Sequence, residues 1–482
     1  MKNLIKIFVL FGGMTVFTAC SDDLLQTEPR QSLTPEVALA DVPGYQALLN
    51  SAYGKLRNFS YYGQQMIIAP DVMADNLRII ANTGRYIGQE SNADRQHINL
   101  WYTAFWTGIN ETNVILAGVD AAKGADADKA AIKAQALFLR ALFYHDLSKV
   151  FGYEPGREVN GWNKSVILRT TPTLGFSDAD FRERATNTQV YEQIEQDLLA
   201  AIAALPNATL GSAGVYRANK GAAQALLARV YLYAGRNSDA ANMATAAMTS
   251  FGITDAGVGL LSTTNYVSAF AATSGPNPES LFELEQRSVD WSTVDGVNNS
   301  VSSLVSNVGT SAQFILTATD DLIAKYESGD IRRNMWVSTT RSGASGNIFR
   351  NEKWRGQKGD FLQNISLIRG SELILIRAEA RYKLANESGA LADMNALRAR
   401  RGLAALTSSL TGVNLFNKIM DERRVEFALE GHRWFDLKRN GMTITKGAGF
   451  TALPYTDYRI LAPLPQAELL LNTKLVNNPE YK

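Results

Sequence analysis

Two groups of aromatic and planar polar side chains in this 482-residue chain could bind a small ligand. A neutral sugar presents C–H faces that stack on exposed aromatic rings, and hydroxyl groups that form hydrogen bonds with Asp, Asn and Arg. The first group comprises Tyr61, Tyr62, Asp75, Asn76, Arg78 and Tyr86, and the second comprises Trp291 and Trp336. Each of these aromatic side chains could instead be buried in the core. The residues form a candidate site only if loops carry them at the surface.

Motifs for catalysis or metal binding are missing from the sequence. It contains no Gly-x-Ser-x-Gly elbow, no phosphate-binding loop and no His-Glu-x-x-His pair. Its three histidines are widely spaced and have no companion cysteine cluster: His97, His145 and His432. We therefore expect no catalytic residue, no metal and no cofactor. A glycoside hydrolase needs only two carboxylates across a cleft, so an enzyme stays an alternative, with Glu279, Glu283 and Glu285 as its first candidates.

The N-terminus has the pattern of an export signal. Lys2 and Lys6 precede an apolar run over residues 7–17, and polar residues from Ser21 onward arrive too soon for a membrane-spanning helix. Small residues then lead to Cys20, the single cysteine of the chain. Cleavage before Cys20 and acylation of the new N-terminus would explain an odd cysteine in an exported protein. We predict a lipoprotein signal peptide over residues 1–19, a lipidated tether over 20–43, and a lipid anchor in a membrane.

Charge and size limit the class of protein. The chain carries 48 basic and 47 acidic residues, and removal of the signal peptide with its two lysines leaves a net charge of about −1. Such a balance argues against a nucleic-acid partner. The chain is longer than the length at which a single hydrophobic core usually stops growing. This predicts either two subdomains or a repeat scaffold with insertions.

Helical hairpins account for most of the periodic sequence. Apolar residues recur at intervals of three and four over residues 44–58, 128–151 and 190–205, and Gly152 follows the second of these helices. Residues 219–250 contain two helices with small residues on one face and a turn at Gly235, and a similar pair spans 372–401. The spacing predicts a mainly α fold built on tetratricopeptide-like helical hairpins.

The central segment differs from the helical parts on both sides. Residues 251–370 are rich in Ser, Thr, Asn and Gly and show no sustained helical period. We expect a loop-rich insertion with short strands, which either presents binding residues or serves as a structural cap. The folded body over 44–482 is then divided into an N-terminal helical part (44–250), the insertion (251–370) and a C-terminal helical part (371–482).

A charged segment near the C-terminus is the most distinctive part of the sequence. A predicted helix over 415–430 begins it and contains a Glu422-Arg423 pair. A Glu430-Gly431 turn and the run Arg433-Trp434-Phe435-Asp436-Leu437-Lys438-Arg439 follow. The spacing of Glu426, Arg433 and Asp436 lets a helix end and its turn exchange charge-assisted hydrogen bonds. We interpret these three residues as structural, ordering a C-terminal strand against the helices.

This segment closely resembles the signature of the RagB/SusD-like outer-membrane lipoproteins of Bacteroidetes. Further matches follow in the family's order over nearly the whole mature chain, from Trp101 and Asn113 to the ending at Tyr481. The resemblance implies a protein at the outer membrane, facing the cell exterior, that forms a lid on a TonB-dependent, SusC-like transporter. It implies capture of oligosaccharide, or in some members of peptide, and the acidic residues after Cys20 resemble the family's surface-export signal.

Three classes of function therefore remain open, and the first, a binding protein, has two candidate ligands. Glycan binding for nutrient uptake is the first, and peptide binding in the same transporter system is the runner-up. An enzyme is the second class, and a helical scaffold that only holds partner proteins is the third. Affinity for a small ligand, without turnover, separates the binding protein from both other classes.

Overall fold

The computed structural model describes residues 35–482 apart from residues 176, 291–292, 310 and 482. Cys20 and Trp291 therefore lie outside the described residues. Helices dominate the N-terminal half, namely α2 (Pro35–Ala38), α3 (Val42–Leu56), α4 (Gln65–Met73), α5 (Ile87–Glu90), α6 (Asn110–Gly118), α7 (Asp126–Phe151), α8 (Asn187–Ala204), α9 (Lys220–Tyr233) and α10 (Asn237–Ser250). Those of the remaining chain are α11 (Tyr266–Phe270), α12 (Thr293–Asn299), α13 (Val301–Val305), α14 (Asp320–Ala324), α15 (Gly370–Lys383), α16 (Glu387–Arg400), α17 (Gly412–Glu426), α18 (Arg433–Arg439) and α19 (Gln466–Leu471).

Short helical turns connect these helices. A π-helix spans Tyr102–Ile109 before α6, and 3₁₀ turns span Val119–Ala121, Asp178–Asp180, Ala213–Tyr216, Ser288–Asp290, Ile331–Met335 and Tyr458–Ile460. No helix in the described part of the chain is long and apolar enough to cross a membrane.

Local signals begin and end the helices where the sequence predicts them. The Thr186 side chain accepts from the backbone N–H of Gln189, whose own side chain accepts from Thr186, so α8 starts with a capping box. Helix α7 ends before Gly152, as expected, but Gly152 is extended (φ −135°) rather than left-handed. A side chain there would meet Ser165 at 3.0 Å, so close packing requires this glycine.

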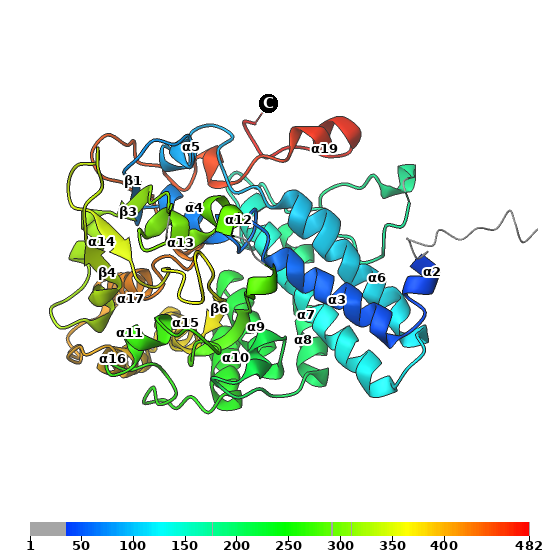
Figure 1. Ribbon diagram of the computed structural model, residues 1–482, viewed down its shortest axis with the longest axis horizontal. Coiled ribbons are helices and arrows are strands. Elements are labelled where there is room, and N and C mark those ends of the chain that lie inside the picture. The colour runs from blue at the N-terminus through cyan, green and yellow to red at the C-terminus, as the bar shows by residue number, and fades with distance from the viewer. Residues whose placement is uncertain (1–34, 176, 291–292, 310, 482) are drawn as a thin grey trace, which may run out of the picture.

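The two predicted helical hairpins lie side by side although 120 residues separate them in sequence. Helix α9 packs on α10 and α15 packs on α16, with turns at Gly235 (φ 70°) and Ala385 (φ 59°). Helix α10 in turn contacts α15, so the hairpins form one layer, which α8 and α7 extend on one side and α17 on the other (Figure 1). The prediction of a mainly α, tetratricopeptide-like scaffold is confirmed.

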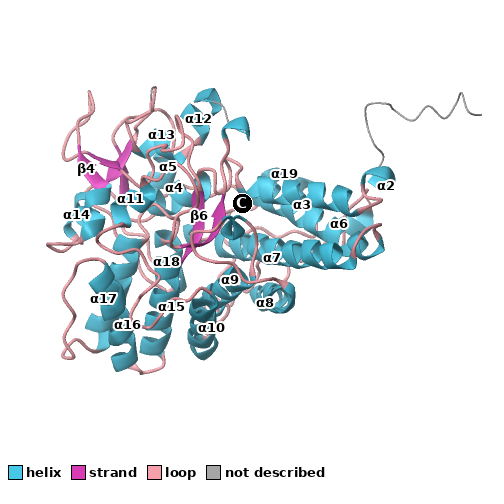
Figure 2. Cartoon of the chain, turned by 60° about the horizontal axis from the view of Figure 1, so that its bottom comes forward, coloured by secondary structure: helices cyan, strands magenta, loops and turns pink. Residues whose placement is uncertain are grey.

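Three two-stranded antiparallel sheets accompany the helices. They pair β1 (Leu77–Ile79) with β3 (Leu316–Ala318), β2 (Ser280–Leu284) with β6 (Ile365–Arg369), and β4 (Trp336–Ser338) with β5 (Phe349–Asn351). Five of these six strands fall within residues 251–370, where the sequence predicts a loop-rich insertion with short strands. Figure 2 shows the short strands beside the helical layer, with long loops between them.

The predicted C-terminal strand is absent from the described residues. After α17 the chain forms a left-handed turn at Leu429 (φ 61°) and Gly431 (φ 78°), and then helix α18. The β structure in the described chain beyond α18 is an isolated bridge between Ile444 and Leu453. A Cβ on Gly431 would lie 2.1 Å from the Met66 carbonyl oxygen, so this turn packs directly on α4. The charged segment therefore orders a turn and a helix, not a strand.

Candidate functional site

A cavity of about 670 Å³ lies where four separate stretches of chain meet, and we call it the Asp75 cavity. Its walls come from the segment after α4, from the start of α14, from α17 and α18, and from the loop 442–450. In Figure 1, β1, α14 and α17 lie together on the left of the molecule, away from α6 to α8. The volume falls in the range of small-ligand sites, roughly 300–1,000 Å³.

The cavity lining is polar and balanced in charge. Five acidic residues line it, Asp75, Glu90, Asp320, Asp321 and Asp421, together with five basic residues, Arg78, Lys325, Arg424, Arg433 and Lys446. Three threonines add hydroxyl groups, Thr319, Thr443 and Thr445, and Phe450 supplies an aromatic ring. That ring is 37% exposed. The lining thus combines planar hydrogen-bonding groups with one accessible aromatic face, the combination a sugar requires.

Asp75 is fixed by the two arginines of the charged segment. Arg433 donates from Nε and Nη2 to the two carboxylate oxygens at 2.7 Å each, and Arg424 donates to the Asp75 carbonyl oxygen at 2.8 Å. Burial by itself would raise the pKa of the Asp75 carboxyl, but the bonds and charge of Arg433 and Arg424 outweigh burial and lower it. Asp75 therefore stays ionised and its carboxylate has a defined orientation in the cavity wall.

Asn76 lies behind the cavity wall. It is buried, its Oδ1 accepts from Arg424 Nε at 2.8 Å, and its amide donates to Asp71. Burial raises the pKa of the Asp71 carboxyl to about 7. The bond to Arg424 means that Asn76 orients this guanidinium instead of reaching a ligand.

Lys446 also lines the cavity. Its ammonium donates to the carbonyl oxygens of Val72, at 3.0 Å, and of Glu90, and it lies 5.5 Å from the centre of the Phe450 ring. Burial lowers the pKa of Lys446 to about 7, although the carboxylates of Glu90 and Asp75 act against that shift. The loop 442–450 thereby fastens to α4 and presents Phe450 to the cavity.

Two of the eight predicted ligand residues line this cavity. These are Asp75 and Arg78, and Arg78 donates to the carbonyl oxygens of Ser345 (3.1 Å) and Asn347 (2.7 Å). Arg433, which the sequence assigns to structure alone, lines it as well. The sequence analysis did not select four further lining residues, namely Asp321, Lys325, Lys446 and Phe450. In the sequence they belong to the start of a short helix and to a glycine-rich loop, and neither pattern indicates a ligand site.

The predicted tyrosine platform is wrong. Tyr61 and Tyr62 are buried, stack on each other at 4.8 Å, and donate from both hydroxyls to Asp146, at 2.6 and 2.8 Å. Tyr86 is also buried and donates to Gln64 at 3.0 Å. Because interior partners satisfy all three hydroxyl groups, these rings belong to the core and present no face to a ligand.

Trp336 is likewise a core residue. Its ring is buried and its indole N–H donates to the Tyr326 hydroxyl at 2.9 Å. The prediction of an exposed ring at Trp336 is therefore wrong, because the β4–β5 hairpin turns this side chain inward. Its companion Trp291 lies in a stretch that the structure does not describe.

The three residues of the predicted structural signature do not bond to one another. Glu426 accepts from Arg401 (2.8 and 2.9 Å), Arg369 (3.0 Å) and Arg332 (3.1 Å) inside the protein. Asp436 accepts from Arg423 at 2.9 Å, and Arg433 turns to Asp75. The three residues therefore do not pair among themselves, but Arg423 at the end of α17 does bond to Asp436 beyond the turn.

Two of the three acidic residues considered for catalysis, Glu279 and Glu283, are paired inside the protein. Glu279 is buried and accepts from Arg369 at 3.0 Å and from Arg401 at 3.2 Å. Glu283 is buried on β2 and accepts from Ser280 and Asn364. Neither residue lines the Asp75 cavity. In the described part of the chain, no group of three or more His, Cys, Asp or Glu side chains is arranged to hold a metal ion.

Comparison with known proteins gives concordant matches in sequence and structure. Residues 25–232 match a SusD-like family model described as starch-binding and associating with the outer membrane, and residues 340–481 match the model of the SusD family. SusD-like protein P2 of Formosa agariphila is 25% identical, over 97% of this chain and 98% of that protein.

Solved structures share the fold along almost the whole chain. A SusD superfamily protein from Bacteroides thetaiotaomicron is 25% identical, with a TM-score of 0.80 over 91% of this chain and 100% of that chain. A laminarin-binding SusD-like protein is 23% identical, with a TM-score of 0.70 over 92% of this chain and 100% of the other.

Proposed function

The chain is a SusD/RagB-like protein, and we propose that it binds oligosaccharide in the Asp75 cavity at the cell surface and delivers it to a TonB-dependent outer-membrane transporter. Membership of a starch-binding, outer-membrane-associated family supports carbohydrate binding. Proteins of this family are binding proteins, which supports a role without turnover. The observation that carries the proposal is the cavity itself, with a volume of about 670 Å³ and a lining of paired charges, threonines and one exposed ring.

The cavity chemistry matches a neutral glycan better than a highly charged one. Asp75 and Arg433 neutralise each other, and so do Arg424 and Asp321, whose carboxylate accepts from Arg424 at 2.6 Å. A ligand therefore meets fixed dipoles and lone pairs with no net charge, which suits hydroxyl groups that donate and accept at once. Phe450 is the ring on which we place the C–H face of a sugar.

Solvent reaches the cavity at α14. The Asp321 side chain is 68% exposed, and the carboxylate of Asp421 beside it is partly exposed and pairs with Lys325 at 3.2 Å. Carboxylates with free lone pairs at a cavity rim accept hydrogen bonds from adjacent sugar hydroxyls. We assign Asp321 and Asp421 to the entrance and Asp75 to the deeper wall.

The placement at the membrane rests on the N-terminal sequence. Cys20 would carry the lipid, and the outer-membrane association named for the matching family is consistent with an anchor there. The chain between Cys20 and α3, which begins at Val42, would then join the lipid to the folded body. A SusC-like transporter is the partner that this family membership implies.

Titration calorimetry with the mature chain carrying Cys20→Ser tests the proposal. The ligands are laminarin and starch oligosaccharides, host and plant glycans, and a peptide mixture. We expect saturable heat with one glycan class, and the variant Phe450→Ala should weaken that binding about tenfold through loss of the stacking ring. A matched control is Leu470→Ala, an exposed apolar residue outside the cavity.

The outcomes separate the remaining functions. If only the peptides give saturable heat, the ligand is a peptide taken up by the same transporter system, and not a glycan. Release of reducing ends from an oligosaccharide would show an enzyme. Transporter binding without affinity for any small ligand would show a scaffold, and equal affinity of the Phe450→Ala variant would move the site away from the Asp75 cavity.

A further inference from the structure

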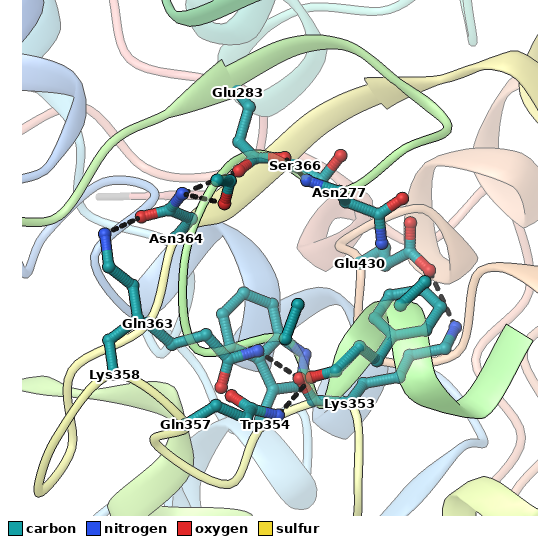
Figure 3. Close-up of a pocket in the computed structure, with 14 residues that line it drawn as sticks. Asn277, Glu283, Lys353, Trp354, Gln357, Lys358, Gln363, Asn364, Ser366 and Glu430 are labelled. Atoms are coloured by element: carbon teal, nitrogen blue, oxygen red, sulfur yellow. Dashed lines mark hydrogen bonds and ion pairs between the residues drawn. The ribbon is translucent and has the colours of Figure 1, made fainter. Parts of the chain in front are cut away.

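A small polar cavity and an exposed apolar helix both lie outside the Asp75 cavity. The small cavity measures about 50 Å³, room for a few waters, and its polar side chains bond to one another, Lys353 to Glu430 and Asn364 to Glu283 (Figure 3). These side chains are committed to the fold. The exposed helix is α19, whose apolar side chains are instead directed to solvent.

Helix α19 forms an apolar ridge at the edge of the molecule. Leu470 and Leu471 are 74% and 64% exposed, and Val476, shortly after the helix, is 61% exposed. Figure 1 shows α19 projecting from the body at the upper edge of the view, near the C-terminus. None of these three side chains lines the Asp75 cavity, so glycan binding there gives no reason for their exposure.

Buried polar side chains fix this segment in place. Trp106 of the π-helix donates from its indole N–H to the Glu468 carboxylate at 2.9 Å, and Asn472 donates to the carbonyl oxygen of Arg182 at 2.9 Å. Glu468 and Asn472 are both buried, whereas the two leucines between them are exposed. The leucines therefore belong to a positioned surface and not to a loose end of the chain.

Neighbouring segments extend the apolar surface. Tyr102, which begins the π-helix, is 44% exposed and lies beside Glu468. Leu174 is 81% exposed and follows Thr173, whose carbonyl oxygen accepts from Asn110 at 3.0 Å, directly after the π-helix. We call the exposed apolar residues of these segments the α19 patch, namely Tyr102, Leu174, Leu470, Leu471 and Val476.

The composition of the α19 patch suits a lipid surface. Aliphatic side chains gain free energy by entering the boundary between headgroups and acyl chains, while tyrosine and tryptophan place their rings at headgroup level. Leucine and valine are the most exposed members of the patch, and Tyr102 and Trp106 lie nearer the body. A projecting ridge also enters a deformable bilayer directly, whereas a protein partner would need a complementary groove.

The predicted lipid anchor would keep the α19 patch close to a membrane. The chain from Cys20 to Pro35, where α2 begins, can span at most about 50 Å. Near that point Gly118 packs against the hydroxyl of Tyr45 on α3, and Trp106 lies roughly 18 Å away along the helices that join them. The patch is therefore well within the reach of the anchored chain.

We propose that the α19 patch contacts the outer surface of the membrane that holds the lipid anchor, with Leu470 and Leu471 entering the acyl boundary. This inference rests on the anchor at Cys20 in the proposed function and is independent of the ligand. Figure 1 shows β1, α14 and α17, which line the Asp75 cavity, at the end of the molecule away from α2. Contact at α19 together with the anchor would thus orient the body with its cavity open to the medium.

Hydrogen exchange on vesicles tests this proposal with the mature chain. Cys20 is the single cysteine, so its thiol couples the chain at one point to a maleimide lipid in vesicles of equal parts phosphatidylethanolamine and phosphatidylglycerol. The reference is the same chain in solution, with Cys20 capped by N-ethylmaleimide. We expect the backbone amides of residues 466–476 to exchange about tenfold more slowly on the vesicles, because the lipid excludes water from them.

A double variant tests the apolar side chains themselves. Leu470→Gln combined with Leu471→Gln removes the apolar tips without adding charge, and we expect it to lose the protection. Leu384→Gln is the matched control, because Leu384 is also exposed (49%) but follows α15 in another part of the molecule. This control should keep the protection. Thermal unfolding of each variant verifies the fold.

The outcomes decide what covers the α19 patch. The proposal is overturned if residues 466–476 exchange equally fast on vesicles and in solution, or if the double variant keeps the protection. Protection that grows with protein concentration without vesicles would assign the patch to a second copy of the chain, and protection that requires a SusC-like transporter would assign it to that partner. Either result also overturns the membrane contact.

Failure of the anchor and failure of the membrane contact give different results. Chemical coupling supplies the anchor in the vesicle experiment, so its outcome does not depend on acylation in the cell. Mass spectrometry of the chain from the producing cell shows separately whether Cys20 carries a lipid. Oligosaccharide calorimetry with the double variant should match the parent, since neither leucine lines the Asp75 cavity.

Discussion

Helix α17 places two neighbouring charged residues, Glu426 and Arg424, in two different surroundings. Glu426 points into the protein, where Arg332, Arg369 and Arg401 surround it, and we call these four residues with Glu279 the Glu426 cluster. Two residues earlier on the same helix, Arg424 reaches the Asp75 cavity. Sequence spacing alone does not separate these roles, since both residues lie in one charged helical turn.

The difference between the two sites lies in the exposure of the partners. Every member of the Glu426 cluster is buried, and the three arginines hold the pKa of Glu426 well below its usual range although burial acts to raise it. Arg424 is buried too, but its partner Asp321 is largely exposed. A charge pair with both members buried is committed to the fold, whereas a pair with one exposed member can share its hydrogen bonds with a ligand.

The largest effect should come from breaking the Glu426 cluster. Glu426→Ala leaves three arginines buried without their common partner, and we expect the free energy of unfolding to fall by about 3–5 kcal/mol. Urea denaturation of the mature chain measures this loss. Glu192→Ala, at an exposed position of α8, is the control and should stay within about 0.5 kcal/mol of the parent. A loss below about 1 kcal/mol for Glu426→Ala would mean that the cluster does not hold the fold.

Acid should destabilise the protein through its buried charge pairs. Arg229 lowers the pKa of Glu372 to about 2 against the opposing effect of burial. A carboxyl with a lowered pKa contributes stability above its unfolded pKa and loses it as the pH falls through the folded value. We therefore expect a loss on the order of 3 kcal/mol between about pH 5 and pH 2 from this residue.

The variant Glu372→Gln isolates that contribution. Its unfolding free energy should change less between pH 5 and pH 2 than that of the parent, as measured by urea denaturation at each pH. Asp321→Asn is the comparison at the cavity rim, where a largely exposed charge pair contributes little to stability. Equal profiles for the parent and Glu372→Gln would contradict this assignment.

Asp75 is held in a charge pair with Arg433 and also lines the cavity, so its substitution should affect both stability and ligand binding. Asp75→Asn removes the charge that Arg433 meets in a two-bond pair, and we expect a loss of about 1.5–3 kcal/mol in unfolding free energy together with weaker oligosaccharide binding. Denaturation and calorimetry measure the two effects. Asp126→Asn, whose side chain is 99% exposed at the start of α7, is the matched control. Unchanged binding with reduced stability would place Asp75 with the structural charges.

The smallest effect on stability should come from Asp321. Its pair with Arg424 is exposed on one side, so Asp321→Ala should cost less than about 1 kcal/mol in unfolding free energy. Oligosaccharide affinity should still fall about three- to tenfold through the loss of a carboxylate at the entrance. Calorimetry at constant salt detects this change. A stability loss as large as that of Glu426→Ala would erase the distinction between the cluster and the rim.

Local patterns in the sequence were sufficient to predict the helical scaffold. The apolar period and small residues over 219–250 and 372–401 predict two helical hairpins, and both form, because neighbours three and four positions apart share a helix face. The charged segment after Glu422 is equally recognisable as a family signature. Asp75 and Arg78 could also be chosen as ligand residues, since their side-chain chemistry is visible in the sequence.

Only the tertiary structure decided which of these side chains can meet a ligand. Tyr61 and Tyr62 look like loop aromatics in sequence, but Asp146, far away along the chain, binds both hydroxyl groups and holds the rings in the core. Trp336 is held there by a bond from its indole N–H to Tyr326, ten residues earlier. The sequence by itself determined the elements and the chemistry available on them. Burial and pairing come from contacts between distant segments, such as Arg433 with Asp75 across 358 residues, and no local spacing encodes such a contact.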